Sequence, residues 1–136
     1  MNHTLGLALM ILLVSSMVTS ASFALPVHAL YGHPVILTNA SYGTLGSYNV
    51  VKANLTNISS SFLDLMVFAV WKNSAAQTVV VTTGGLTLAS AATDTAFAPL
   101  ASPPPSGTYT VNVFTVATST TSYPVISPTF SFSVTI

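Results

Sequence analysis

The chain of 136 residues contains no cysteine, no arginine and no glutamate. Without cysteine, no disulfide can crosslink the fold, and neither a thiol nucleophile nor a thiolate metal ligand exists. An exported protein of this composition has to obtain its stability from packing alone.

Charge is almost absent, because the only charged side chains are Lys52, Asp64, Lys72 and Asp94. So few cations exclude nucleic-acid binding through phosphate contacts and leave no polybasic segment for an anionic lipid surface. The polar surface must come mostly from serine, threonine and asparagine, and a net charge of zero favours association. We therefore expect a protein that contacts copies of itself or carries sugars.

The scarcity of carboxylates predicts stability in acid. Acid unfolds proteins mainly by protonating carboxylates that are paired in the native state, and this chain has only two aspartates besides its terminus. We expect thermal melts at pH 2 and pH 7 to give midpoints within about 5 °C of each other, which corresponds to roughly 1 kcal/mol in a domain of this size. A much lower midpoint at pH 2 would contradict this expectation of a protein suited to an acidic exterior.

Hydrophobic residues make up 51% of the chain, which is too many for a disordered protein. The longest apolar run covers residues 5–14, LGLALMILLV, and predicts a hydrophobic α-helix within residues 1–31. The side chains expected to form its contact surface, an assembly helix in a self-associating protein, are Leu5, Leu7, Leu9, Met10, Ile11, Leu12, Leu13 and Val14.

The same segment also fits a secretory signal. Small residues at the −3 and −1 positions predict cleavage after Ala24 or after Ala29. However, the leading MNHT carries no lysine or arginine, unlike the usual signal, which favours a subunit whose basic leader has already been removed. In such a subunit the helix is retained and contacts the membrane or neighbouring helices, and Pro26 would end or kink it. Cleavage and retention both stay open, with retention slightly favoured.

From residue 34 onward the hydrophobic period changes to two, which indicates β-strands. Strands are expected at residues 48–55, 63–71, 107–114 and 129–136, with a hairpin of 78–81 and 86–89 turned at Thr83-Gly84-Gly85. About seven short strands over about 100 residues predict an antiparallel β-sandwich over residues 34–136. The fold class is therefore mainly β, preceded by a hydrophobic helix.

The strand at residues 63–71 is apolar on both faces. One face carries leucine, valine, alanine and Trp71, while the other carries Phe62, Met66, Phe68 and Val70. The second face is too apolar to be left in water, so we expect a neighbouring subunit to cover it.

The stretch SGTYTVNVF resembles the penultimate strand of immunoglobulin-like and fibronectin-type sandwiches. In that pattern a tyrosine bonds back to the chain and forms a tyrosine corner, and Tyr109 is the matching residue. The resemblance implies an immunoglobulin-like sandwich.

The whole layout, an apolar N-terminal segment followed by an almost uncharged, Ser/Thr-rich β-domain, resembles archaeal type IV pilins. That resemblance implies a structural subunit of an extracellular, cell-surface filament that serves adhesion or surface attachment. Identical subunits would polymerise through their helices, which anchor them in the membrane before assembly, and the glycosylated β-domains would face outward.

Two other interpretations stay open. If the signal is cleaved, a secreted, thread-type fimbrial subunit would polymerise by donor-strand complementation, with residues 35–37 completing a neighbour's sheet. The chain also suits a membrane-tethered or virion surface binding module, which would form discrete particles rather than fibres.

Sequons for N-linked glycans occur at Asn2, Asn39, Asn54 and Asn57, and we expect glycans at the last three. No cofactor or metal is expected, since His28 and His33 have no evident third ligand. Two aspartates thirty positions apart, without glutamate or cysteine, give no catalytic constellation, so we do not expect an enzyme. Lysine–asparagine isopeptide chemistry would need a buried carboxyl nearby, and solvated surface charges are the simpler interpretation.

Overall fold

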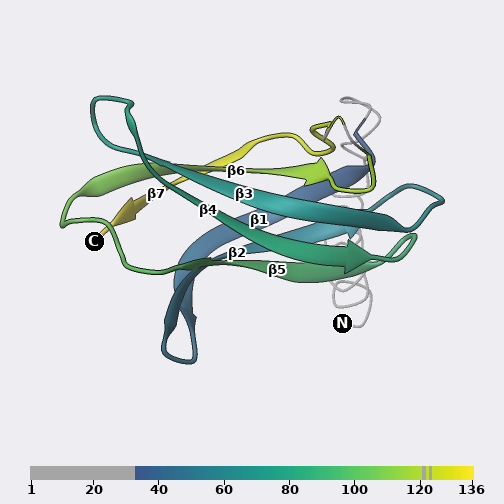
Figure 1. The fold of residues 1–136 in the computed structure, drawn as a ribbon, viewed down its shortest axis with the longest axis horizontal. Coiled ribbons are helices and arrows are strands. Elements are labelled where there is room, and N and C mark those ends of the chain that lie inside the picture. Colours follow the sequence, from purple (N-terminus) through teal and green to yellow (C-terminus); the bar gives the residue numbers. More distant parts are fainter. Residues whose placement is uncertain (1–32, 121, 123) are drawn as a thin grey trace, which may run out of the picture.

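The computed structural model describes residues 33–136 apart from 121 and 123. This part of the chain contains seven antiparallel strands in two sheets and no helix (Figure 1). The strands are β1 (Val35–Leu45), β2 (Tyr48–Asn57), β3 (Leu63–Lys72), β4 (Thr78–Leu88), β5 (Thr93–Leu100), β6 (Thr108–Ala117) and β7 (Phe130–Thr135). The prediction of a mainly β fold with about seven strands is confirmed.

The two sheets differ in size. Sheet A has the order β1-β2-β5, and sheet B has the order β4-β3-β6-β7. Each sheet turns alternate residues inward, so the core is built from the period-two pattern of the sequence. The fully buried core includes Leu55 of β2, Val67 and Trp71 of β3, and Val111 of β6.

Three aromatic rings pack against one another in one part of this core. The Trp71 ring meets Tyr42 of β1 edge-on at 5.4 Å and Tyr109 of β6 at 6.1 Å, measured between ring centroids. Edge-to-face contacts at these distances are favourable beyond the area they bury. The three rings therefore connect sheet A to sheet B.

The predicted hairpin at Gly84-Gly85 is wrong. Strand β4 runs without interruption from Thr78 to Leu88, and both glycines lie within it, opposite Val67 and Met66 of β3. A Cβ on Gly84 would lie 2.7 Å from the carbonyl carbon of Phe97 in β5. Gly84 is therefore a point of close backbone approach between the two sheets, which is a recognised use of glycine within strands.

A two-residue turn at Gly46-Ser47 joins β1 to β2. Gly46 has a φ of +59°, which glycine adopts without strain and which the first position of a type II′ hairpin turn requires. The hairpin extends beyond the sandwich in Figure 1 and exposes Leu45 and Tyr48 at its tip.

The segment at residues 35–37, considered above as a donor strand, pairs within its own chain. Val35, Ile36 and Leu37 lie opposite Asn57, Thr56 and Leu55 of β2. An exchange mechanism would therefore have to replace β1 of one subunit by β1 of another.

The predicted assembly helix, the cleavage positions after Ala24 and Ala29, and the sequon at Asn2 lie outside the described residues. Within residues 33–136 apart from 121 and 123, no helix is long and apolar enough to cross a membrane.

Candidate interaction surface

The outer face of sheet B carries a group of outward apolar side chains from three neighbouring strands. Strand β3 turns its buried residues to the core and leaves the alternate ones half-buried on this outer face. The apolar members, hereafter the sheet B face, are Met66, Phe68 and Val70 of β3, Val79 and Val81 of β4, and Phe114 of β6. The face predicted to be too apolar for water is thus located on the outside of the sandwich.

Two stacked rings occupy the centre of the sheet B face. Phe68 and Phe114 are cross-strand partners, and their rings lie parallel, with centroids 5.5 Å apart and planes 4° apart. On β4, Val79 and Val81 remain 43% and 52% exposed. Aromatic side chains at the centre of a patch are typical of the residues that carry most of the energy of protein–protein contacts.

The sheet B face bears two opposite charges along one strand. Asp64 and Lys72 lie on β3 four residues before and four residues after Phe68, so all three side chains point to the same side. The other two charged side chains of the chain, Lys52 and Asp94, belong to β2 and β5 of sheet A.

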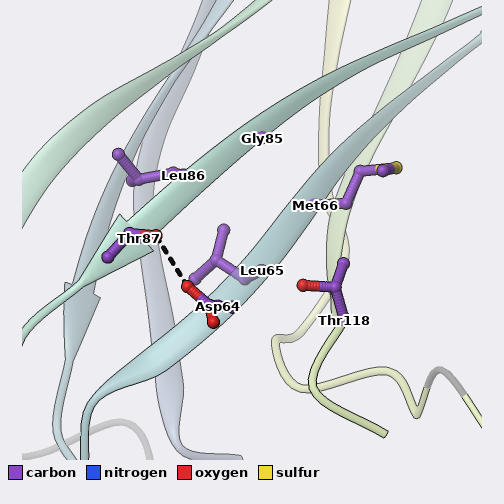
Figure 2. Close-up of a pocket in the computed structure, with 7 residues that line it drawn as sticks. All are labelled: Asp64, Leu65, Met66, Gly85, Leu86, Thr87 and Thr118. Atoms are coloured by element: carbon purple, nitrogen blue, oxygen red, sulfur yellow. Dashed lines mark hydrogen bonds between the residues drawn. The ribbon is translucent and has the colours of Figure 1, made fainter. Parts of the chain in front are cut away.

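A hollow of about 470 Å³ opens beside Asp64 (Figure 2). It exists because Gly85, opposite Met66, has no side chain and open space above its Cα. The Asp64 carboxylate lies between the hydroxyl groups of Thr87 and Thr118 in this view, and Thr87 donates a hydrogen bond of 2.6 Å to Asp64 Oδ1. The second oxygen, Oδ2, accepts no hydrogen bond from any residue that the structure describes. The hollow can therefore accept a small cationic group.

Sequence reasoning found one strand of this face and missed the rest. Phe114 and the threonines around Asp64 join it only through the register of β6 and β4 against β3. Phe114 does alternate with Val113 in the sequence, but alternation alone does not say which strand lies beside β3.

The outer face of sheet A holds two of the predicted glycan sites. Asn39 is exposed on β1 and lies directly opposite the half-buried Asn54 on β2. Asn54 Oδ1 accepts a hydrogen bond of 2.8 Å from Thr95, and Nδ2, the atom that would carry a sugar, donates none to the described residues. Directly opposed residues have Cβ atoms about 5 Å apart, so two glycans here would crowd each other.

The prediction of a glycan at Asn57 is wrong, because the side chain is buried and hydrogen-bonded. The residue is fully buried, and its Nδ2 donates to the carbonyl groups of Ser61, Leu88 and Ala89 at 2.7, 3.1 and 3.1 Å. A sugar on this nitrogen would replace one of its two N–H donors, and the fully buried side chain leaves no space for the sugar in the folded domain. Asn57 is therefore a structural residue, and we exclude it as a glycan carrier.

Tyr109, singled out for a tyrosine corner, lies at the start of β6. Its hydroxyl group donates a 2.6 Å hydrogen bond to the carbonyl of Pro105, four residues upstream. The loop of residues 102–107 is thereby attached to the core strand. This is the back-bond that the resemblance to immunoglobulin-like sandwiches implies.

Replacing Tyr109 with phenylalanine is expected to lower the free energy of unfolding by about 1 kcal/mol. The ring contact with Trp71 is kept, so only the hydrogen bond to Pro105 is lost. Equilibrium urea denaturation measures the difference. Tyr109→Ala, which also removes the ring, should cost about three times as much, and equal losses for the two variants would show that the hydroxyl has no stabilising role.

Residues 33–136, without 121 and 123, contain no cluster of three or more potential metal ligands. Asp64 and Lys72 are eight residues apart on one extended strand, or about 27 Å, so they cannot crosslink within one chain.

Comparison with known proteins gives a likeness in structure only. No family model matches the chain, and no curated protein sequence matches it significantly. A putative β-galactosidase from Bacteroides fragilis matches 76% of the chain with a TM-score of 0.56 and 13% identity. A β-glucuronidase from glycoside hydrolase family 2 matches 76% with a TM-score of 0.51 and 13% identity.

These matches concern a small part of each enzyme. The chain spans 18% of the length of the putative β-galactosidase and 13% of the β-glucuronidase. At this level of identity they show the sandwich fold and no activity.

Proposed function

We propose that the protein is a structural, non-enzymatic subunit of an extracellular filament. Its sandwich would be immunoglobulin-like, and its N-terminal apolar segment would form the helix through which subunits polymerise. The observation that carries the proposal is the combination of an almost uncharged chain with the apolar run at residues 5–14. Both features favour contact with identical copies over existence as a single chain.

The arrangement of the sandwich supports the immunoglobulin-like class. Trp71 is buried on the third strand, and Tyr109 makes its back-bond from the sixth strand. Both are hallmarks of that class. Strand β4 pairs with β3 rather than with sheet A, unlike the fourth strand of constant-type immunoglobulin domains.

Electron microscopy of the full-length protein, isolated from the surface of cells that express it, tests the proposal. We expect fibres with a regular axial repeat. Discrete particles would instead support the alternative of a tethered or virion surface binding module, and the filament proposal would be abandoned.

N-terminal sequencing of the mature protein separates the two assembly mechanisms. A start within the first few residues supports polymerisation through the helix, and Leu12→Lys should then abolish fibres because it places a charge in the apolar contact. A start at Leu25 or Leu30 supports strand exchange through β1.

The outer face of sheet A is proposed to carry the sugar. Because Asn39 and Asn54 oppose each other, we expect one glycan from this pair in each chain. Intact mass spectrometry of the wild type, of Asn39→Gln and of Asn54→Gln identifies the occupied residue. A mass equal to that of the bare chain would rule out glycosylation.

A further inference from the structure

We infer that the sheet B face pairs with the same face of a second copy around a two-fold axis, with Lys72 of each copy entering the hollow beside Asp64 of the other. The inference adds a second contact to the proposed self-assembly and does not need the N-terminal helix. It is argued from the charges, the rings and the hollow described above.

The positions of the two charges are self-complementary. Asp64 and Lys72 are equally distant from Phe68, four residues on either side along β3. A two-fold axis that lies between the two faces and crosses β3 at Phe68 reverses the strand direction. It therefore places Lys72 of one copy over Asp64 of the other, and the reverse pair forms by symmetry.

The centre and the edge of this contact match the usual anatomy of interfaces. The stacked Phe68 and Phe114 rings lie close to the axis and would pack on their own symmetry mates. The charged residues lie at the rim, where they set register and orientation more than affinity. A shifted or parallel arrangement would separate the charges and leave the hollow unfilled.

The hollow can hold the ammonium group of Lys72 from the second copy. Thr87 holds one oxygen of the Asp64 carboxylate, and the other oxygen remains free among the described residues. Gly85 leaves the space through which a lysine side chain can reach this carboxylate. The chain has two lysines and no arginine, and Lys72 is the lysine that shares the sheet B face.

The contact should be weak in isolation. Four strands about 4.8 Å apart and about 27 Å long present on the order of 500 Å² per copy, less than the roughly 800 Å² per partner of a standard interface. A two-fold contact also closes on itself and cannot propagate a fibre. This step rests on the proposed filament. There, the two-fold contact would join two neighbouring filaments laterally, and the repetition of subunits along both filaments would multiply a weak contact.

Carbodiimide crosslinking of the full-length protein in mild detergent tests the pairing. The reagent joins carboxylates to amines in direct contact, and the chain offers only Asp64, Asp94 and the terminal carboxyl group against Lys52, Lys72 and the terminal amine. Because Asp64 and Lys72 of one chain are about 27 Å apart, a linked Asp64–Lys72 peptide must come from two copies. We expect this link to dominate the crosslinked dimer in mass spectra.

A charge-swap series supplies the control. Asp64→Lys and Lys72→Asp each set like charges against each other at both symmetric positions and also remove one reacting group of the link, so their dimer is measured by sedimentation without crosslinker, where it should fall about tenfold. The double variant, Asp64→Lys with Lys72→Asp, restores opposite charges and should restore the dimer, with the link now between the exchanged residues. Gly85→Val fills the hollow and should also reduce the dimer, while thermal melts verify that each variant is folded.

The outcomes separate this inference from the proposed function. Links that involve mainly Asp94 or Lys52, no linked dimer, or a yield that the swaps leave unchanged would overturn the pairing, even if fibres are seen. A swap-dependent Asp64–Lys72 link without any fibres would keep the pairing and overturn the filament. In fibres, the single variants should convert paired filaments into separate ones.

Discussion

Gly84→Ala is expected to lower the free energy of unfolding by about 3 kcal/mol, or the melting midpoint by roughly 15 °C. The added methyl group would meet the carbonyl carbon of Phe97 at 2.7 Å and the amide nitrogen of Ala98 at 3.2 Å. Both are backbone atoms of β5, which cannot rotate away as a side chain could. The variant must therefore separate the two sheets at this point or fail to fold.

The neighbouring glycine provides a matched control. A Cβ on Gly85 meets nothing within 4 Å, and its φ lies outside the left-handed region. Gly85→Ala should leave stability unchanged or raise it by about 0.5 kcal/mol, because alanine loses less backbone entropy on folding. Similar losses for the two variants in urea denaturation would show that glycine as such, and not the approach of Phe97, is required in β4.

Asn57→Ala is expected to lower the free energy of unfolding by about 3 to 4 kcal/mol. The buried amide satisfies the carbonyl groups of Ser61, Leu88 and Ala89, and its oxygen accepts hydrogen bonds from the Ser59 amide and hydroxyl groups at 2.9 and 2.7 Å. Removing it leaves a cavity at a fully buried position and breaks the buried hydrogen bond to the Leu88 carbonyl group, while Ser59, Ser61 and Ala89 lose their partner at the edge of the core. The loop after β2 would also lose its connection to the end of β4.

Two further substitutions test whether the loss of stability comes from the buried amide group of Asn57. Asn57→Asp keeps the shape and the acceptor but replaces both donors by a charge, so it should cost at least as much as the alanine variant at neutral pH. Asn39→Ala, at an exposed sequon asparagine, should change stability by less than about 0.5 kcal/mol. A small effect of Asn57→Ala in thermal or urea unfolding would mean that the network does not hold the loop.

The sequence predicted the strands whose alternation is uninterrupted. The inward faces of β2, β3 and β6 follow directly from hydrophobic residues at every second position, and so does the position of the sheet B face on β3. The local pattern suffices there because each strand buries one side more deeply than the other over most of its length, although both sides of β3 are apolar.

Three features needed information that the local pattern does not carry. Gly84-Gly85 has the composition of a turn, and only the approach of β5 shows why glycine lies inside a strand. Strand β5 was not predicted; it contains Pro99, which is tolerated since β5 is an edge strand of sheet A. Asn57 was taken for a surface residue because β2 was expected to end two residues earlier, although continued alternation places it on the inward face.

Both lysines of the chain lie inside strands, Lys52 in the middle of β2 and Lys72 at the end of β3. Proteases usually cut folded domains at exposed loop tips, and no loop within the described part of the chain carries a lysine or arginine. Enzymes of the trypsin type therefore have no ready target in the folded sandwich. A protein displayed outside the cell would in this way outlast such enzymes without any inhibitor or disulfide.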